Sequence, residues 1–216
     1  STRVRSSAAS DVYKRQVLKY HNIDKITIGR ININMKIYAY LADGFETVEA
    51  LGVIDILRRA KLDVVTVSVG TSKSVMTSHN IEVKADIMFD ESDYTDGDMI
   101  FLPGGGNGTK NLLAHEGLKK VILDYYDRDK YIAAICAAPS ILGHYGLLKG
   151  KKATCFPGFE SELIGADYRG DGVVVDGKII TARGMGKTID LGLKLLEILD
   201  GNETAVRIGN AIQYLV

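Results

Sequence analysis

The chain has 216 residues, which is long enough for one α/β domain with a substantial hydrophobic core. Its 27 basic side chains balance 27 acidic ones, so the net charge gives no support for nucleic-acid binding. Two cysteines are too few for a disulfide framework and indicate a reducing compartment, and no apolar run approaches the roughly 20 residues that span a bilayer. We therefore expect a cytoplasmic protein whose partners are neither nucleic acids nor membranes.

Residues 1–34 differ in composition from the rest of the chain. Residues 1–16 are rich in Ser, Ala and Arg, and Asp11 is their only acidic residue. Such a composition is typical of a transit peptide, which would direct the protein to an organelle. The alternative, which we favour, is translated upstream or added sequence, because Met35-Lys36-Ile37 resembles a native start. We expect residues 1–34 to be a leader outside the fold and residues 35–216 to form the domain.

Apolar, β-prone segments alternate with helical patterns from residue 35 onward. We expect strands at residues 36–41, 63–69, 99–102, 131–135, 173–175 and 179–181, and a short β-like segment at 153–156. We expect helices at residues 46–59, 110–127, 187–199 and 203–214, and one that begins after Pro139 and ends near residue 146. Asp176-Gly177 predicts a hairpin, and residues 75–84 form a hairpin or an edge excursion around Ser78-His79-Asn80. The alternation predicts a mostly parallel sheet with helices on both faces.

Three of the connecting loops leave the carboxyl ends of predicted strands. They comprise residues 42–49, 103–108 and 136–139. Ligands of open α/β sheets bind outside these strand ends. The sequence therefore places an acidic residue, a glycine-rich backbone and a thiol on one rim of the sheet.

Cys136 lies where an apolar strand turns into a helical pattern. This strand–turn–helix layout resembles the elbow on which α/β hydrolases hold a nucleophile. The N-terminus of the following helix would favour a thiolate. The alternative is a buried structural cysteine, because free cysteine packs well as a small hydrophobe.

The glycine-rich loop and the first helix supply two further candidates. Residues 103–108 lack the third glycine of G-x-G-x-x-G, because Thr109 occupies its position, so we interpret the loop as an oxyanion hole or a tight turn. Glu46 and Glu49 begin the first helix, where acids commonly stabilise the dipole. If Glu49 instead points into the rim, burial and a neighbouring thiolate would raise its pKa, and it could transfer protons to and from the cysteine.

The four histidines are His21, His79, His115 and His144, and none is adjacent to Cys136. We expect His115 on a helix surface and His144 to pack or cap, and we keep only His79 as a possible pocket residue. The Cys and His residues lack zinc-binding spacing, so the sequence predicts no metal.

Four motifs together resemble the DJ-one/ThiJ/PfpI superfamily, and most closely its DJ-one clade, over residues 35–216. They are Ala134-Ile135-Cys136-Ala137-Ala138-Pro139, Leu102-Pro103-Gly104-Gly105, Asp43-Gly44-Phe45-Glu46-Thr47-Val48-Glu49 and Ala182-Arg183-Gly184. The resemblance implies a flavodoxin-like three-layer α/β sandwich, usually a homodimer, with a strained nucleophile at Cys136. It implies that Glu49 hydrogen-bonds this cysteine. It also implies that the Gly104–Gly105 turn and Ala137 line the pocket with backbone N–H groups.

Members of this superfamily are described as cofactor-free glyoxalases that convert methylglyoxal to lactate, as deglycases of early glycation adducts, and as oxidative-stress sensors that form cysteine sulfinate. Two positions depart from the clade pattern. Phe156 replaces a frequent histidine, which leaves Glu49 with more of the proton transfer, and His79 stands where arginine is common. The protease-like branch has a histidine directly after the cysteine, so Ala137 argues against that branch. Cys155 is either a resolving thiol near the pocket or a packed strand cysteine.

We therefore hypothesise a glutathione-independent glyoxalase or deglycase that acts on a small aldehyde without a cofactor. Its nucleophile is Cys136, its acid–base group is Glu49, and the N–H groups of Gly105 and Ala137 hold the oxyanion. The alternative is an oxidative-stress sensor that uses the same cysteine. A peptidase or amidase is the weakest alternative, because no histidine base is evident beside the nucleophile.

Overall fold

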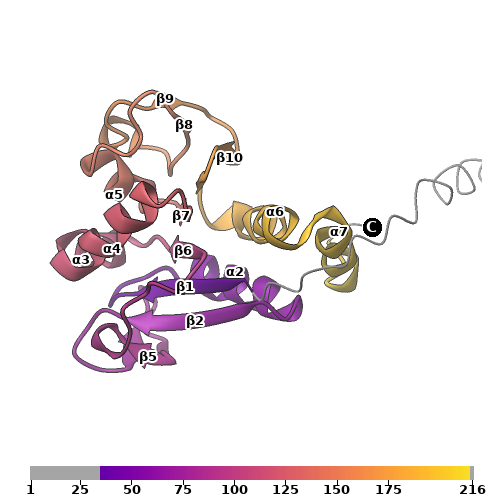
Figure 1. Cartoon of the computed structure of the whole chain (residues 1–216), viewed down its shortest axis with the longest axis horizontal. Coiled ribbons are helices and arrows are strands. Elements are labelled where there is room, and N and C mark those ends of the chain that lie inside the picture. The colour runs from indigo at the N-terminus through magenta and orange to yellow at the C-terminus, as the bar shows by residue number, and fades with distance from the viewer. Residues whose placement is uncertain (1–34, 215–216) are drawn as a thin grey trace, which may run out of the picture. The chain divides into compact units, whose positions relative to one another are not determined.

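The computed structural model describes residues 35–214 of the protein (Figure 1). The expected leader at residues 1–34 lies outside the described residues. Within the described range, a seven-stranded sheet has the order β10-β11-β7-β6-β1-β2-β5. All of its neighbouring strands pair in parallel except β10 and β11, which form an antiparallel hairpin. The predicted mostly parallel α/β sheet is therefore confirmed.

The strands of this sheet follow the predicted apolar segments closely. They are β1 (Lys36–Leu41), β2 (Asp63–Ser68), β5 (Ile87–Met88), β6 (Met99–Leu102), β7 (Tyr131–Ile135), β10 (Val173–Asp176) and β11 (Ile179–Ala182). The strand β5 was not predicted, because two residues are too few to show periodicity. The hairpin at Asp176-Gly177 is confirmed by the pairing of Val173 with Ala182 and of Asp176 with Ile179.

Helices cover both faces of the sheet, which makes three layers. They are α2 (Thr47–Arg59), α3 (Gly106–Ala114), α4 (Glu116–Asp127), α5 (Pro139–His144), α6 (Thr188–Asp200) and α7 (Asn202–Ala211). Residues 37, 39 and 41 of β1 belong to one buried cluster together with α2, α6 and α7. Tyr38 and Tyr40, on the opposite face of the same strand, belong to the other cluster together with α3, α4 and α5. This division follows from the two-residue period of a strand.

The single helix predicted for residues 110–127 is wrong, because two helices meet at His115. α3 begins at Gly106, and α4 begins directly after His115. The Nδ1 atom of His115 accepts a hydrogen bond of 3.0 Å from the Leu118 N–H, and its ring packs on Phe89 at 4.4 Å between centroids. His115 is therefore a helix cap rather than the expected helix-surface residue. The imidazole takes the capping role that Ser or Asp usually fills.

Two smaller β units complete the described structure. β3 (Ser74–Met76) and β4 (Glu82–Lys84) pair antiparallel, which confirms the hairpin at Ser78-His79-Asn80. β8 (Lys152–Ala153) pairs in parallel with β9 (Asp167–Tyr168), so the predicted β-like segment at 153–156 is a strand only at its start. Short 3₁₀ helices are η1 (Phe89–Glu91), η2 (Glu160–Glu162) and η3 (Met185–Lys187). None of the helices between residues 35 and 214 is long and apolar enough to cross a membrane.

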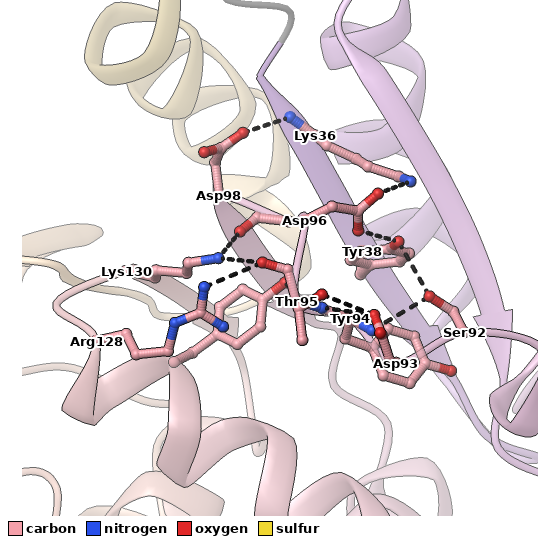
Figure 2. A network of polar contacts seen from close by, with 12 residues as sticks. Lys36, Tyr38, Ser92, Asp93, Tyr94, Thr95, Asp96, Asp98, Arg128 and Lys130 are labelled. Carbon is pink, nitrogen blue, oxygen red and sulfur yellow. Dashed lines mark hydrogen bonds and ion pairs between the residues drawn. The ribbon is translucent and has the colours of Figure 1, made fainter.

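A network of polar contacts ties together the amino ends of β1, β6 and β7 (Figure 2). The backbone N–H of Lys36 donates to Asp98 at 2.9 Å, and its ammonium pairs with Asp96 at 2.6 Å. Asp96 also accepts a hydrogen bond of 2.7 Å from the Tyr38 hydroxyl. Lys130, just before β7, donates to the carbonyl oxygen of Thr95 at 2.9 Å. These contacts fix one edge of the sheet, which leaves the carboxyl edge for chemistry.

The two tyrosines of β1 give a matched test of this network. Both side chains are buried, but only the Tyr38 hydroxyl has hydrogen-bond partners among the described residues. We expect Tyr38→Phe to lower the free energy of unfolding by about 1–2 kcal/mol, because Asp96 loses a donor. Tyr40→Phe should change it by less than about 0.5 kcal/mol. Urea denaturation of both variants measures this, and equal effects would contradict the assigned role of the network.

Candidate active site

Cys136 follows the last residue of β7 and stands in a strained conformation. Its φ angle is 67°, a left-handed value that is uncommon for a residue with a side chain. Its N–H donates to the Ala182 carbonyl at 2.9 Å, and its own carbonyl accepts from the Phe156 N–H at 2.8 Å. Pro139 then begins α5, so the chain turns sharply at the cysteine. The predicted strand–elbow–helix geometry is present, and it holds the thiol half-buried at the carboxyl edge.

Glu49 lies in the first turn of α2 and is buried, with only 1% of its surface exposed. Its Oε2 atom accepts a hydrogen bond of 3.1 Å from the Gly104 N–H. The Met185 N–H and the Cys136 thiol are the other hydrogen-bond partners of the Glu49 carboxyl group. A carboxyl group at this depth requires such partners, because burial without them is costly. Glu49 therefore points into the rim rather than into solvent at the helix start.

Gly104 is the residue that allows the carboxyl and the thiol to meet. A Cβ atom at this position would lie within 3 Å of Glu49 Oε2, Cys136 Cβ and the Ile135 carbonyl oxygen. Any side chain would separate the two functional groups. The sequence suggested that the Gly104 N–H contributes to an oxyanion hole. In the structure this N–H donates to Glu49, so Gly104 positions the carboxyl.

The N–H groups of Gly105 and Ala137 are directed at the Cys136 sulfur. Gly105 has a φ angle of 93° and lies at the start of α3. A Cβ atom there would collide with the backbone of residues 44–46. The loop before α2 is in turn fixed by the Glu46 N–H, which donates to the Gly104 carbonyl at 3.0 Å. Two backbone donors thus face the position where an oxyanion attached to the cysteine would form.

The electrostatics of Glu49 and Cys136 are those of a coupled pair. Burial raises the pKa of Glu49 to about 7, and the charge of Glu46 adds to this effect. Burial also raises the pKa of the Cys136 thiol to about 12, with a further contribution from the charge of Glu49. The N–H groups of Gly105 and Ala137 oppose this shift but do not overcome it. The expected depression of the thiol pKa by α5 is therefore wrong, because the six-residue helix is outweighed by burial and a carboxylate.

These shifts keep the Cys136 thiol protonated near neutral pH, where Glu49 is present in both its protonated and its ionised form. An ionised Glu49 can take the thiol proton as the sulfur attacks a carbonyl carbon, and this transfer leaves the net charge of the pair unchanged. A protonated Glu49 donates to a thiolate, and an ionised Glu49 accepts from a thiol. The arrangement can therefore generate a nucleophile without a histidine.

The remaining predicted pocket residues occupy different environments. His79 is exposed, and its ring contacts Ser78 at 3.0 Å and Glu46 at 3.5 Å; these contacts do not include Cys136 or Glu49. Cys155 is completely buried in the cluster with α3, α4 and α5, and burial raises its pKa to about 11. Phe156 is 47% exposed. Its ring carbon Cδ2 lies 3.1 Å from the point where a Cβ of Gly184 would stand.

The sequence reasoning missed the part of the site contributed by residues after β11. Gly184 and Met185 line the far side of the Glu49 carboxyl, and the Met185 N–H binds it. The available signal was positional, because residue 182 ends a strand parallel to β7 and opens a fourth loop on the same edge. A backbone donor leaves no side-chain pattern, so its role could not be deduced.

The chain is similar to known proteins over the whole described domain. A family model described as "DJ-1/PfpI family" matches residues 35–198. Protein DJ-1 homolog B of Arabidopsis thaliana is 37% identical over 172 residues, which is 79% of this chain and 39% of that protein. The Parkinson disease protein 7 homolog of Danio rerio is 32% identical over 173 residues, 78% of this chain and 91% of that protein. This chain spans 39% and 44% of the lengths of the two Arabidopsis relatives, DJ-1 homologs B and A.

Solved structures agree with these relatives. Oxidized DJ-1 of Toxoplasma gondii superposes with a TM-score of 0.81 at 33% identity, covering 84% of this chain and 100% of that one. Drosophila melanogaster DJ-1beta superposes with a TM-score of 0.80 at 29% identity, covering 83% and 97% of the two chains. The three-layer sheet is thus the flavodoxin-like fold expected from the sequence. This chain belongs to the DJ-1/PfpI family, within its DJ-1 clade.

Proposed function

We propose that the protein is a glutathione-independent glyoxalase of small 2-oxoaldehydes, with deglycase action on early glycation adducts as the related reaction. The observation that supports this most directly is the buried Glu49 carboxyl bonded to the Cys136 thiol beside two backbone donors. A nucleophile, a proton carrier and an oxyanion site then lie within one pocket. Nucleophilic addition to a carbonyl group followed by proton transfer requires these three groups.

The proposed reaction uses only these groups and water. The Cys136 sulfur adds to the aldehyde carbon and gives a hemithioacetal, while the Gly105 and Ala137 N–H groups stabilise the oxyanion. Glu49 removes the proton from that carbon and returns a proton to the adjacent carbonyl carbon through an enediol. The first carbon is thereby oxidised to a thioester and the second is reduced to an alcohol. Water cleaves the thioester, which releases the 2-hydroxy acid and restores Cys136.

The assigned roles of Cys136 and Glu49 can be tested with methylglyoxal and no added glutathione. We expect the protein to form lactate over many turnovers, and Cys136→Ala to abolish this activity. Glu49→Gln should lower kcat/KM by at least about 100-fold, because the amide cannot carry the proton. Cys155→Ala is the matched thiol control and should retain activity, since Cys155 is completely buried and belongs to a different apolar cluster from the one that Cys136 borders. Lactate must be quantified directly, because loss of methylglyoxal also reports reversible adducts with thiols and amines.

Two results would contradict this proposal. Full activity of Glu49→Gln would remove the carboxyl from the mechanism. Absence of lactate from the unmodified protein would reject the glyoxalase reaction, and release of lactate from a glycated peptide would then distinguish the deglycase.

The pKa of Glu49 has a consequence for stability that does not depend on turnover. A carboxyl with an ordinary value of 4.5 in the unfolded chain and about 7 in the folded protein binds its proton more tightly when folded. Folding stability from this group is therefore complete below pH 4.5 and is lost as the pH rises to 7. Between pH 4.5 and pH 7 we expect the free energy of unfolding of the unmodified protein to fall by up to about 3 kcal/mol relative to that of Glu49→Gln. A constant difference in urea denaturation between pH 4.5 and pH 8 would show that Glu49 has no raised pKa.

A redox sensor is the second candidate function, and the contrast between the two cysteines favours it. Cys136 is half-buried and strained, whereas Cys155 is fully buried. Two equivalents of peroxide convert a thiolate to a sulfinate and release two waters. The Gly105 and Ala137 N–H groups and a protonated Glu49 could bind the resulting oxygens. An oxidized structure exists for the Toxoplasma gondii relative.

Peroxide titration with intact-mass measurement separates the two candidates. We expect a species with two added oxygens in the folded protein, absent from Cys136→Ala, with Cys155 modified only after denaturation. Formation of this species together with negligible lactate production would favour the sensor. Equal modification of both cysteines in the folded protein would reject the selective site.

A peptidase or amidase receives less support. The hydrogen bonds of the described histidines, His79, His115 and His144, involve Ser78, Leu118 and Glu162 rather than Cys136. The homodimer implied by the resemblance stays a prediction, as does the cytoplasmic location.

A further inference from the structure

Phe156 places an exposed aromatic ring beside the proposed acid–base group. Nearly half of this side chain, 47%, is exposed, although large apolar side chains usually avoid water. Gly184 locates the ring relative to the site. The point where a Gly184 Cβ would stand is 3.1 Å from Phe156 Cδ2 and 3.9 Å from Glu49 Oε1. The ring edge and this carboxyl oxygen therefore flank the same small space.

The two oxygens of Glu49 face different neighbours. Oε2 accepts the Gly104 N–H, which holds it next to the cysteine. Oε1 is the oxygen that lies toward Gly184 and therefore toward the Phe156 ring. A substituent that extends from a carbon bonded to the cysteine past Oε1 toward Gly184 would consequently meet the ring. Gly184 lets the ring approach this closely because it has no side chain, since a Cβ atom there would be only 3.1 Å from Phe156 Cδ2.

Hydrogen bonds fix the backbone that carries the Phe156 ring relative to Cys136. The Phe156 N–H donates to the Cys136 carbonyl at 2.8 Å, and its carbonyl accepts from the Phe159 N–H at 3.1 Å. The preceding Cys155 side chain is completely buried, and the Thr154 N–H donates to Thr181 Oγ1 at 2.9 Å. The loop that carries the ring is thus hydrogen-bonded directly to the backbone of the nucleophile. A preformed apolar surface of this kind binds with a small entropy cost.

We propose that Phe156 determines substrate specificity by packing against the substituent on the ketone carbon, and that the protein prefers aryl-substituted 2-oxoaldehydes. This inference rests on the proposed glyoxalase function. An aromatic ring offers an aryl group apolar area and edge or offset stacking, whereas a methyl group gains little from it. The ring has no titratable atom, so its contribution is to binding and not to proton transfer. The reaction on phenylglyoxal has the same balance, with water consumed and mandelate released.

The test compares phenylglyoxal with methylglyoxal, measured as mandelate and lactate. The unmodified protein should have the higher kcat/KM for phenylglyoxal. Phe156→Ala should lower this ratio about tenfold, and Phe156→Tyr should restore it because the ring is kept. Tyr126→Ala is the matched control for an exposed aromatic side chain and should leave the ratio unchanged. Tyr126 ends α4 just before β7 begins, at the opposite edge of the sheet from Cys136.

A second readout keeps the specificity inference separate from the proposed function. Each aldehyde is tested for its ability to protect Cys136 from iodoacetamide, with intact mass to exclude arginine adducts. Phenylglyoxal should protect the unmodified protein at about tenfold lower concentration than it protects Phe156→Ala, whether or not product forms. If Phe156→Ala lowered kcat/KM or protection equally for both aldehydes, Phe156 would not determine specificity. Selective protection without any product would instead reject the glyoxalase function and retain the aryl-binding surface.

Discussion

The hydrogen bond between the buried Glu49 carboxyl and the Cys136 thiol is the constraint on which the functional edge depends. A carboxyl that is 1% exposed can remain there only with donors, and the backbone N–H groups of Gly104 and Met185 supply them. These donors come from the loops after β6 and β11, while the thiol follows β7 and the carboxyl follows β1. The loops after four different strands must therefore meet for the carboxyl and the thiol to be paired.

The site lowers stability, and the rest of the fold offsets this. Cys136 is held at a φ angle of 67°, and Glu49 resists ionisation because it is buried. Stabilising interactions concentrate elsewhere, in two apolar clusters on the faces of the sheet and in the Lys36–Asp96–Tyr38 network at the amino ends of the strands. The parallel arrangement separates the two requirements, since all loops that carry chemistry leave from the opposite edge. Strain at the cysteine therefore need not propagate into the contacts that hold the sheet together.

Much of this organisation could be predicted from the sequence, and the failures have identifiable physical causes. Buried parallel strands such as β1 and β7 are continuous apolar runs, and the carboxyl-edge rule brings the loops of Glu49, Gly105 and Cys136 together. The break at His115 was missed because an imidazole is an unusual cap. The raised thiol pKa was missed because the contribution of a helix end is visible in sequence, whereas the burial and the carboxylate that outweigh it depend on packing. The donor at Met185 is a backbone group, which every residue type except proline could provide.

The protonation of Glu49 also relates the two candidate functions to each other. The proposed reaction would require Glu49 to accept and return a proton, and a pKa of about 7 permits this exchange at neutral pH. Retention of a sulfinate requires the carboxyl to stay protonated, because an ionised Glu49 would repel it. The same site would therefore favour carbonyl chemistry when Glu49 exchanges its proton, and would favour the oxidised cysteine when Glu49 stays protonated. Oxidation of Cys136 would consume the nucleophile, so the two proposed functions would be alternative states of the same pair of residues rather than independent activities.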